Sequence, residues 1–267
     1  MKKIINRTQD GRVNMEVYVN EGSAELLPAI ISLPGGAFTH LSDTDKEPTA
    51  MTFYRCGFQT FVLNYSVGKY SEYPAPLDDI SWAILQIRKH SIEWRVNPDK
   101  IVVMGFSAGA SVAGMSATQW NITGLSERIG AADAKEIRPD AAVIAYGACN
   151  TSETIVKNPN IERPGSWGKI VTDLTPELDW LNYVDKTTPP MFIWQPAYDK
   201  YVPKENQIML ANALKENGVK YELHMFKDGY HGMSVGYNAP GYTLTDSPHP
   251  DADRWVNLCI DWLNRVL

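Results

Sequence analysis

Residues 105–109 read Gly-Phe-Ser-Ala-Gly, a pattern that can present a serine for nucleophilic catalysis. The apolar run KIVVM precedes Ser107 and the helix-forming run ASVAGMSATQ follows it, which predicts a sharp turn between a strand and a helix. Glycines on both sides of the serine allow that strand and that helix to approach closely. A serine in an ordinary glycine-flanked turn is the alternative interpretation, so the partners of a nucleophile must be sought elsewhere in the chain.

A serine hydroxyl needs a general base, which histidine most often supplies. The five histidines are His40, His90, His224, His231 and His249. Sites built on such a turn follow the chain order serine, acid, histidine, so the first two histidines come too early. His224 lies inside a predicted strand, whereas His231 follows that strand in the glycine-flanked stretch FKDGYHGMS. We therefore predict His231 as the base and keep His249, in the loop SPHPD, as the less favoured candidate.

The acid should lie between Ser107 and His231 in the chain, directly after a strand. Asp199 follows the apolar run at 191–194 and precedes the helix that begins near Pro203. Its role would be to accept a hydrogen bond from His231 and fix the imidazole tautomer. Asp185 precedes the same strand and would lie at the opposite edge, whereas Asp228 shares the histidine loop and is the reserve candidate. An aspartate that only caps a helix is the alternative interpretation for Asp199.

An acyl-transfer site also needs backbone N–H groups that stabilise the oxyanion. One donor is expected from Ala108, the residue after the nucleophile, and another from the loop after an earlier strand. The sequence LPGGAF follows the apolar run at 29–33, so Gly36 and Ala37 are the predicted donors of that loop.

These residues require a sheet that brings several strand ends together. Apolar runs predict strands at 29–33, 60–65, 100–105, 141–146, 191–194 and 221–226. Most are apolar at consecutive positions, which is typical of parallel strands covered on both faces, while the last alternates and suits an edge strand. Residues 13–19 are expected to add an antiparallel strand.

Helical patterns alternate with the strands, as expected for a doubly wound α/β fold with right-handed crossovers. One helix places Leu77, Ile80, Ile84 and Ile87 on one face. Two more helices are predicted at 203–217 and 255–266, and a fourth directly follows Ser107. The chain, residues 1–267, is therefore expected to form a single α/β domain with a mostly parallel sheet and helices on both faces.

Residues 149–188 interrupt this alternation with a long polar, proline-containing segment, which we expect to form a small lid-like insertion over the site. Phe38 and Tyr198 are predicted to contact substrate, and Trp167 and Tyr230 are further aromatic residues near the expected mouth. Such rings could stack on a sugar, although packing is an equally good explanation for aromatic residues in loops.

The bulk composition narrows the function classes. The formal net charge of −6 and the lack of a basic run argue against nucleic acid and an anionic membrane surface as partners. Three widely spaced cysteines form no disulfide pattern, and neither a signal peptide nor a membrane-spanning run is recognisable. The expectation is a cytoplasmic protein, with no metal site because no ligand spacing occurs. The oligomeric state is left open.

Taken together, five segments resemble the α/β-hydrolase serine esterases, in particular the bacterial acetyl esterase and acetylxylan-esterase-like branch related to hormone-sensitive lipase. They are LPGGAF, GFQTFVLNYSV with YPAPLDDI, NPDKIVVMGFSAGA, TTPPMFIWQPAYDKYVP and YELHMFKDGYHGMS. The resemblance implies the α/β-hydrolase fold and assigns Ser107, Asp199 and His231 to the catalytic triad. It also implies hydrolysis of short-chain, mainly acetyl, esters of small molecules or carbohydrates, without a cofactor.

Two positions depart from the family pattern. The related lipases commonly have His-Gly-Gly-Gly where this chain has residues 34–37, Pro-Gly-Gly-Ala, so the Cβ of Ala37 narrows the approach to the oxyanion donors. Ala110 stands where many relatives have glycine. An amidase, formamidase or peptidase on the same fold is the alternative activity, and a non-catalytic binding protein of this fold is the less favoured one.

Overall fold

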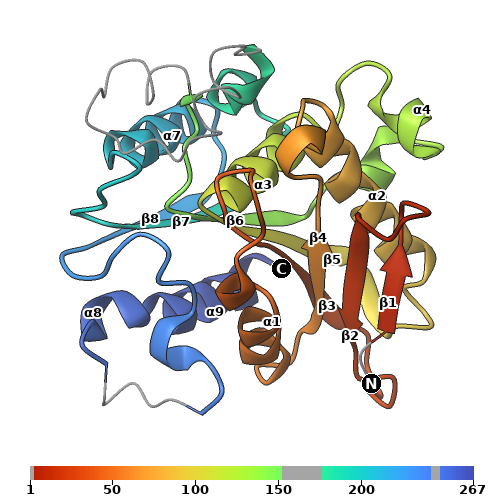
Figure 1. The fold of residues 1–267 in the computed structure, drawn as a ribbon, viewed down its shortest axis with the longest axis horizontal. Helices are drawn as coiled ribbons and strands as arrows, with labels where there is room; N and C mark the ends of the chain where they lie inside the picture. Colours follow the sequence, from red (N-terminus) through yellow and green to blue (C-terminus); the bar gives the residue numbers. More distant parts are fainter. Residues whose placement is uncertain (1–2, 152–175, 242–246) are drawn as a thin grey trace.

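The computed structural model describes residues 3–151, 176–241 and 247–267. Within these residues, eight strands form one sheet in the order β1-β2-β4-β3-β5-β6-β7-β8 (Figure 1). The strands are β1 (Lys3–Asn6), β2 (Asn14–Tyr18), β3 (Leu27–Leu33), β4 (Gln59–Asn64), β5 (Val96–Phe106), β6 (Ala141–Ala145), β7 (Met191–Pro196) and β8 (Tyr221–Phe226).

The sheet is parallel from β4 to β8 and antiparallel at its other edge, where β1 pairs with β2 and β2 with β4. The predicted strands are confirmed, including the antiparallel one near the N-terminus and the edge position of β8. The sequence did not predict β1, whose four residues are exposed or half-buried and carry no apolar signal of a covered strand.

Helices cover both faces of the sheet (Figure 1). On one face lie α2 (Ala75–Lys89), α3 (Ala108–Thr118), α4 (Leu125–Ile129) and α7 (Glu205–Glu216). On the other face lie α1 (Glu47–Tyr54), α8 (Pro250–Asp253) and α9 (Trp255–Val266). Short 3-10 turns complete the described structure at Asp43–Asp45, Gly68–Tyr70, Ala134–Ile137, Pro176–Leu178, Trp180–Tyr183 and Gly236–Asn238.

Two apolar cores, one on each face of the sheet, explain why the central strands are apolar at consecutive positions. Ile31 and Val103 pack into the core that includes the buried face of α2, whereas Ile30 and Val102 pack into the core that includes α9. Neighbouring residues of a strand point to opposite faces, so a strand covered on both sides needs apolar residues throughout.

The parallel strands bring their carboxyl ends to one edge of the sheet. The register pairs Ala29 with Ile101 and Leu33 with Gly105, so β3 ends beside the turn that follows β5. The loops after β3, β5, β7 and β8 therefore emerge at this edge, where α/β folds build their sites. These loops carry the predicted oxyanion donors, nucleophile, acid and base.

Candidate active site

Ser107 occupies the sharp turn that connects β5 to α3. Its backbone has φ 53° and ψ −117°, a strained conformation for a residue with a side chain, which costs about 1–3 kcal/mol. The Ser107 N–H donates to the Ala145 carbonyl at 3.0 Å, which ties the turn to the end of β6. The first turn of α3 begins at the next residue, so the positive end of the helix dipole lies beside the serine.

The two glycines around Ser107 are required by close backbone contacts. A Cβ on Gly105 would lie 2.1 Å from the carbonyl oxygen of Gly109. A Cβ on Gly109 would lie 2.0 Å from the carbonyl oxygen of Leu33, at the end of β3. The expected close approach of strand and helix is therefore present, and it extends to the strand that leads into the glycine loop.

The structure brings Ser107, His231 and Asp199 together in one hydrogen-bonded chain. The Ser107 hydroxyl lies 2.8 Å from His231 Nε2, and His231 Nδ1 lies 2.8 Å from Asp199 Oδ2. The Asp199 side chain is fully buried and that of His231 is 15% exposed, so solvent reaches the imidazole and not the carboxylate. This arrangement can move a proton from the hydroxyl to the imidazole and stabilise the resulting positive charge.

Asp199 is held in place by its other carboxylate oxygen. Oδ1 accepts the backbone N–H groups of Tyr201 at 2.8 Å and Val202 at 2.9 Å. The aspartate therefore organises the turn before α7 and binds the histidine at the same time. The alternative that Asp199 only caps a helix does not describe it, because α7 begins at Glu205 with Lys204 as its N-cap residue.

Two aromatic rings enclose the imidazole of His231. The ring centroid of Tyr146 lies 4.9 Å from that of His231, and the centroid of Tyr201 lies 5.1 Å away. Tyr146 is fully buried, and burial raises the pKa of its phenol well above the ordinary value, so it remains a neutral hydroxyl. Sequence reasoning did not select Tyr146, because it ends an apolar run and has the pattern of another strand residue.

The reserve candidates for the base and the acid, His249 and Asp228, have other partners. His249 Nδ1 accepts the Gly229 N–H at 3.3 Å, and its ring packs edge-on against Tyr230. Asp228 accepts the N–H groups of Asp251 and Ala252 and so caps α8. Within the described residues, neither side chain is hydrogen-bonded to Ser107 or His231.

The remaining candidates are also engaged away from Ser107. Asp185 accepts from the Thr187 N–H and hydroxyl in the turn before β7, at the opposite edge of the sheet. The other three histidines bond to neighbouring residues, His40 to Thr39, His90 to Gln86 and His224 to Glu222.

The glycine loop after β3 lies against the serine. A Cβ on Gly35 would approach the Ser107 Cβ to 3.3 Å, which places this backbone beside the nucleophile. Gly36 has φ 126° and Ala37 has φ 54°, so the chain turns tightly through left-handed backbone. Across the described residues, the N–H groups of Gly36, Ala37 and Ala108 donate no hydrogen bond, which leaves them available to an oxyanion.

Two buried side chains hold this loop in place from behind. The Tyr65 hydroxyl donates to the Pro34 carbonyl at 2.7 Å, and the Gly35 N–H donates to Asp45 Oδ2 at 2.9 Å. Sequence reasoning missed Asp45, because it lies in the polar stretch SDTDKEP, which has the composition of a solvated loop. Its burial in fact leaves only 3% of the residue exposed.

The predicted substrate-binding aromatic residues have mixed surroundings. Phe38 packs edge-on against Tyr65 with ring centroids 6.4 Å apart, whereas Tyr198 is 79% exposed. Tyr230 is also exposed, and Trp167 lies outside the described residues. A contact between substrate and either Phe38 or Tyr198 stays a prediction.

Only the ends of the predicted insertion at 149–188 are described, because residues 152–175 lie outside the described ranges. At the C-terminal end of the insertion, Trp180 is fully buried, and its indole N–H donates to the Ala148 carbonyl at 2.9 Å. The Trp180 ring fills the space that a side chain at Gly114 of α3 would need. This end therefore packs into the body of the protein, and a lid function for the segment stays a prediction.

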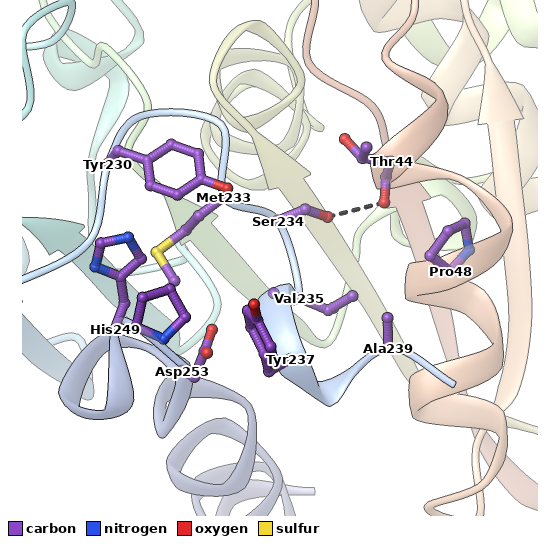
Figure 2. A pocket seen from close by; sticks show the side chains of 12 residues that line it. Thr44, Pro48, Tyr230, Met233, Ser234, Val235, Tyr237, Ala239, His249 and Asp253 are labelled. Carbon is purple, nitrogen blue, oxygen red and sulfur yellow. Dashed lines mark hydrogen bonds between the residues drawn. The ribbon is translucent and has the colours of Figure 1, made fainter. Parts of the chain in front are cut away.

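A cavity of about 450 Å³ lies beside the histidine loop (Figure 2). Its walls include Thr44, Tyr230, Ser234, Tyr237, His249 and Asp253. No member of the Ser107–His231–Asp199 chain is among the described residues that line it. Ser234 and Thr44 lie next to each other in its wall, where the Ser234 hydroxyl donates to the Thr44 carbonyl at 2.9 Å (Figure 2).

Two kinds of feature are absent from the part of the chain that the structure describes. Its His, Cys, Asp and Glu side chains form no group of three or more that could hold a metal ion. None of its helices combines the length and the apolar character needed to cross a membrane.

Known proteins share this fold and much of this sequence. Residues 15–214 match the model of the BD-FAE family, which is about three quarters of the chain. Among curated proteins, the chain is 31% identical to endo-1,4-beta-xylanase B of Butyrivibrio fibrisolvens over 77% of this chain and 32% of that protein. It is 26% identical to an acetylxylan esterase of Xylanibacter ruminicola over 88% of this chain and 46% of that protein.

The chain thus spans 32% and 46% of the length of these two curated relatives. A solved structure covers it almost completely. The acetyl ester-xyloside bifunctional hydrolase from Caldicellulosiruptor lactoaceticus aligns with a TM-score of 0.77 and 28% identity over 99% of this chain and 96% of that chain. The α/β-hydrolase fold implied by the sequence is therefore confirmed.

Proposed function

Because the chain belongs to the BD-FAE family, we propose that it is a serine carboxylesterase that hydrolyses short-chain acyl esters. One observation carries the proposal, namely the chain of two 2.8 Å contacts from the Ser107 hydroxyl through His231 to the buried Asp199. A nucleophile, a base and a residue that orients the base, in contact and in this order, form the arrangement that acyl transfer requires.

In the proposed reaction, the Ser107 hydroxyl attacks the ester carbonyl while His231 Nε2 takes its proton. Asp199 accepts the Nδ1–H and stabilises the imidazolium. The oxyanion of the tetrahedral intermediate accepts hydrogen bonds from the N–H groups of Ala108 and of Gly36 or Ala37. The imidazolium then protonates the leaving alcohol, and an acyl-serine remains.

Water completes the cycle. His231 removes a proton from a water molecule, whose oxygen attacks the acyl carbonyl, and the same N–H groups hold the second oxyanion. The imidazolium returns its proton to the Ser107 oxygen as the acid leaves. Each step moves one proton between His231 Nε2 and an oxygen of Ser107, of the leaving alcohol or of water, so the residues in contact here suffice.

The proposed substrates are acetyl esters of carbohydrates. Two relatives support this choice by name, an acetylxylan esterase and an acetyl ester-xyloside hydrolase. The loop sequence also favours a small acyl group, because Ala37 places a Cβ beside the oxyanion donors in a conformation that suits glycine better. The cavity in Figure 2 gives no reason to expect a longer acyl group, because Ser107, His231 and Asp199 are not among the described residues that line it.

The test is hydrolysis of p-nitrophenyl acetate, butyrate and octanoate, together with acetylated xylo-oligosaccharides. The wild-type protein should prefer acetate and release acetate from the oligosaccharides, and Ser107→Ala should lose at least about 1,000-fold in kcat. Ser116→Ala is the matched control, because Ser116 is buried in α3, the helix that follows Ser107, and its hydroxyl has no hydrogen-bond partner in the described structure. Equal turnover by wild type and Ser107→Ala would refute the proposal.

A further inference from the structure

A buried carboxylate stands behind the glycine loop and has no role in the proposed proton transfers. Asp45 is 3% exposed, and its Oδ2 accepts the Gly35 N–H at 2.9 Å. Gly35 directly precedes the proposed oxyanion donors, and a side chain on it would approach Ser107 to 3.3 Å. Since a shift of Gly35 carries Gly36 with it, this one hydrogen bond bears on where the oxyanion donors lie.

A second buried residue anchors the histidine loop. Ser234 follows His231 by three residues and is 3% exposed. Its hydroxyl donates to the Thr44 carbonyl at 2.9 Å, its N–H donates to the Tyr146 hydroxyl at 3.0 Å, and its carbonyl accepts the Trp255 indole N–H at 3.0 Å. Figure 2 shows the first of these bonds crossing from the histidine loop to the segment before α1.

The two residues meet in one polar cluster. Thr44, which accepts the Ser234 hydroxyl, directly precedes Asp45. Burial raises the pKa of Asp45, and hydrogen bonding by the Gly35 N–H is the largest effect that lowers it. The glycine loop is therefore bonded to the Asp45 side chain, the peptide bond joins Asp45 to Thr44, and the Thr44 carbonyl is bonded to Ser234 of the histidine loop.

We propose that Asp45 and Ser234 are positioning residues that hold the glycine loop and the histidine loop in a fixed relative geometry. This inference rests on the proposed esterase function. The nucleophile and its base come from different loops than the donors Gly36 and Ala37, and a misplacement of about 1 Å between such groups costs roughly 100-fold in rate.

The experiment compares Asp45→Ala, Asp45→Asn, Ser234→Ala and the Asp45→Ala/Ser234→Ala double variant. A fluorophosphonate counts the competent serines in each sample, and kcat and KM for p-nitrophenyl acetate are expressed per labelled site. Asp45→Ala should lower kcat about 10- to 100-fold and change KM less than about threefold. Asp45→Asn retains an oxygen that can accept the Gly35 N–H, so most of the loss should be recovered.

Ser234→Ala should lower kcat about 3- to 10-fold. Because this variant removes only one hydroxyl, it still tests the proposal if Asp45→Ala does not fold. If the two residues act in one path, the double variant should lose about as much as Asp45→Ala alone. Losses that multiply would overturn the link between the loops.

Asp140→Asn is the matched control. Asp140 is partly buried, and its Oδ2 accepts the Ile101 N–H at 2.9 Å, as Asp45 does with Gly35, but it lies at the opposite edge of the sheet. The kcat per labelled site of the Asp140→Asn protein should equal that of the wild type. An Asp45→Ala protein with fewer labelled sites but unchanged kcat per site would show a purely structural role and overturn the inference. A wild-type protein that hydrolyses no ester would instead overturn the proposed function itself.

Discussion

The substitution Gly109→Ala tests whether the position of the glycine loop depends on its close packing against the turn at Ser107. A Cβ at this position would lie 2.0 Å from the Leu33 carbonyl oxygen and 2.6 Å from that of Pro34. Because Cβ atoms essentially never approach other atoms within 3.0 Å, the end of β3 and α3 must separate by at least 1.0 Å, the difference between 3.0 and 2.0 Å. Both contacts are with backbone, so no side-chain rotation can relieve them.

Two magnitudes follow from this displacement. Overpacking of this kind costs about 1–3 kcal/mol of stability. The shift falls on Pro34 and the residues after it, so the oxyanion donors move relative to the serine, and kcat should fall by about 100-fold. The assay is kcat for p-nitrophenyl acetate, measured at a temperature at which urea unfolding shows the variant to be folded.

Gly218→Ala provides the control for stability. Gly218 has φ +69°, and a Cβ on it would meet no atom within 4 Å, so alanine there costs about 1–2 kcal/mol through its backbone conformation alone. It lies after α7, away from the serine, and should keep the wild-type kcat. A folded Gly109→Ala protein with wild-type kcat would refute the reasoning that this loop contributes the oxyanion donors.

Three further predictions address single groups. Asp199→Asn should lower kcat by about 10³- to 10⁴-fold with little change in KM, because the amide no longer holds the His231 tautomer that accepts a proton; a loss below tenfold would contradict this. Burial raises the pKa of Asp45 above 3.8, so the folded state keeps its proton to higher pH than the unfolded chain and loses stability as pH rises through that range. Urea unfolding should therefore show Asp45→Asn gaining stability relative to wild type between about pH 4 and the raised pKa, and a pH-independent difference would contradict the cause. Of the three cysteines, Cys56 is exposed and the others are buried, so a thiol reagent should modify one thiol in the native protein and three after denaturation.

The strands and most of the site follow from local patterns. Strands covered on both faces need uninterrupted apolar residues, and β8 has the bounds that its alternating pattern indicates, Tyr221–Phe226. Parallel strands then determine which loops share an edge, so residues after strand ends, such as Ser107, Asp199 and His231, could be grouped before any distance was known. The chain order of nucleophile, acid and base excluded His40 and His90, whereas His249 and Asp228 stayed open until the distances were known.

Residues that support the site from behind carry no such signal. Asp45 is polar within a polar stretch, and its burial results from the way the segment before α1 folds under the glycine loop. Tyr146 has φ 40° at the end of β6, and its contact with His231 depends on a loop more than 80 residues away in sequence. Tertiary contacts of this kind are set by packing and leave no periodic trace in the sequence.

Covalent labelling of Ser107 tests the central claim most directly. The native protein is treated with a fluorophosphonate, its intact mass is measured, and the modified peptide is sequenced by tandem mass spectrometry. We expect one adduct per chain, on Ser107, with matching loss of esterase activity and no adduct on Ser107→Ala. An adduct on another residue, or an unlabelled Ser107 in a protein that still hydrolyses esters, would contradict it.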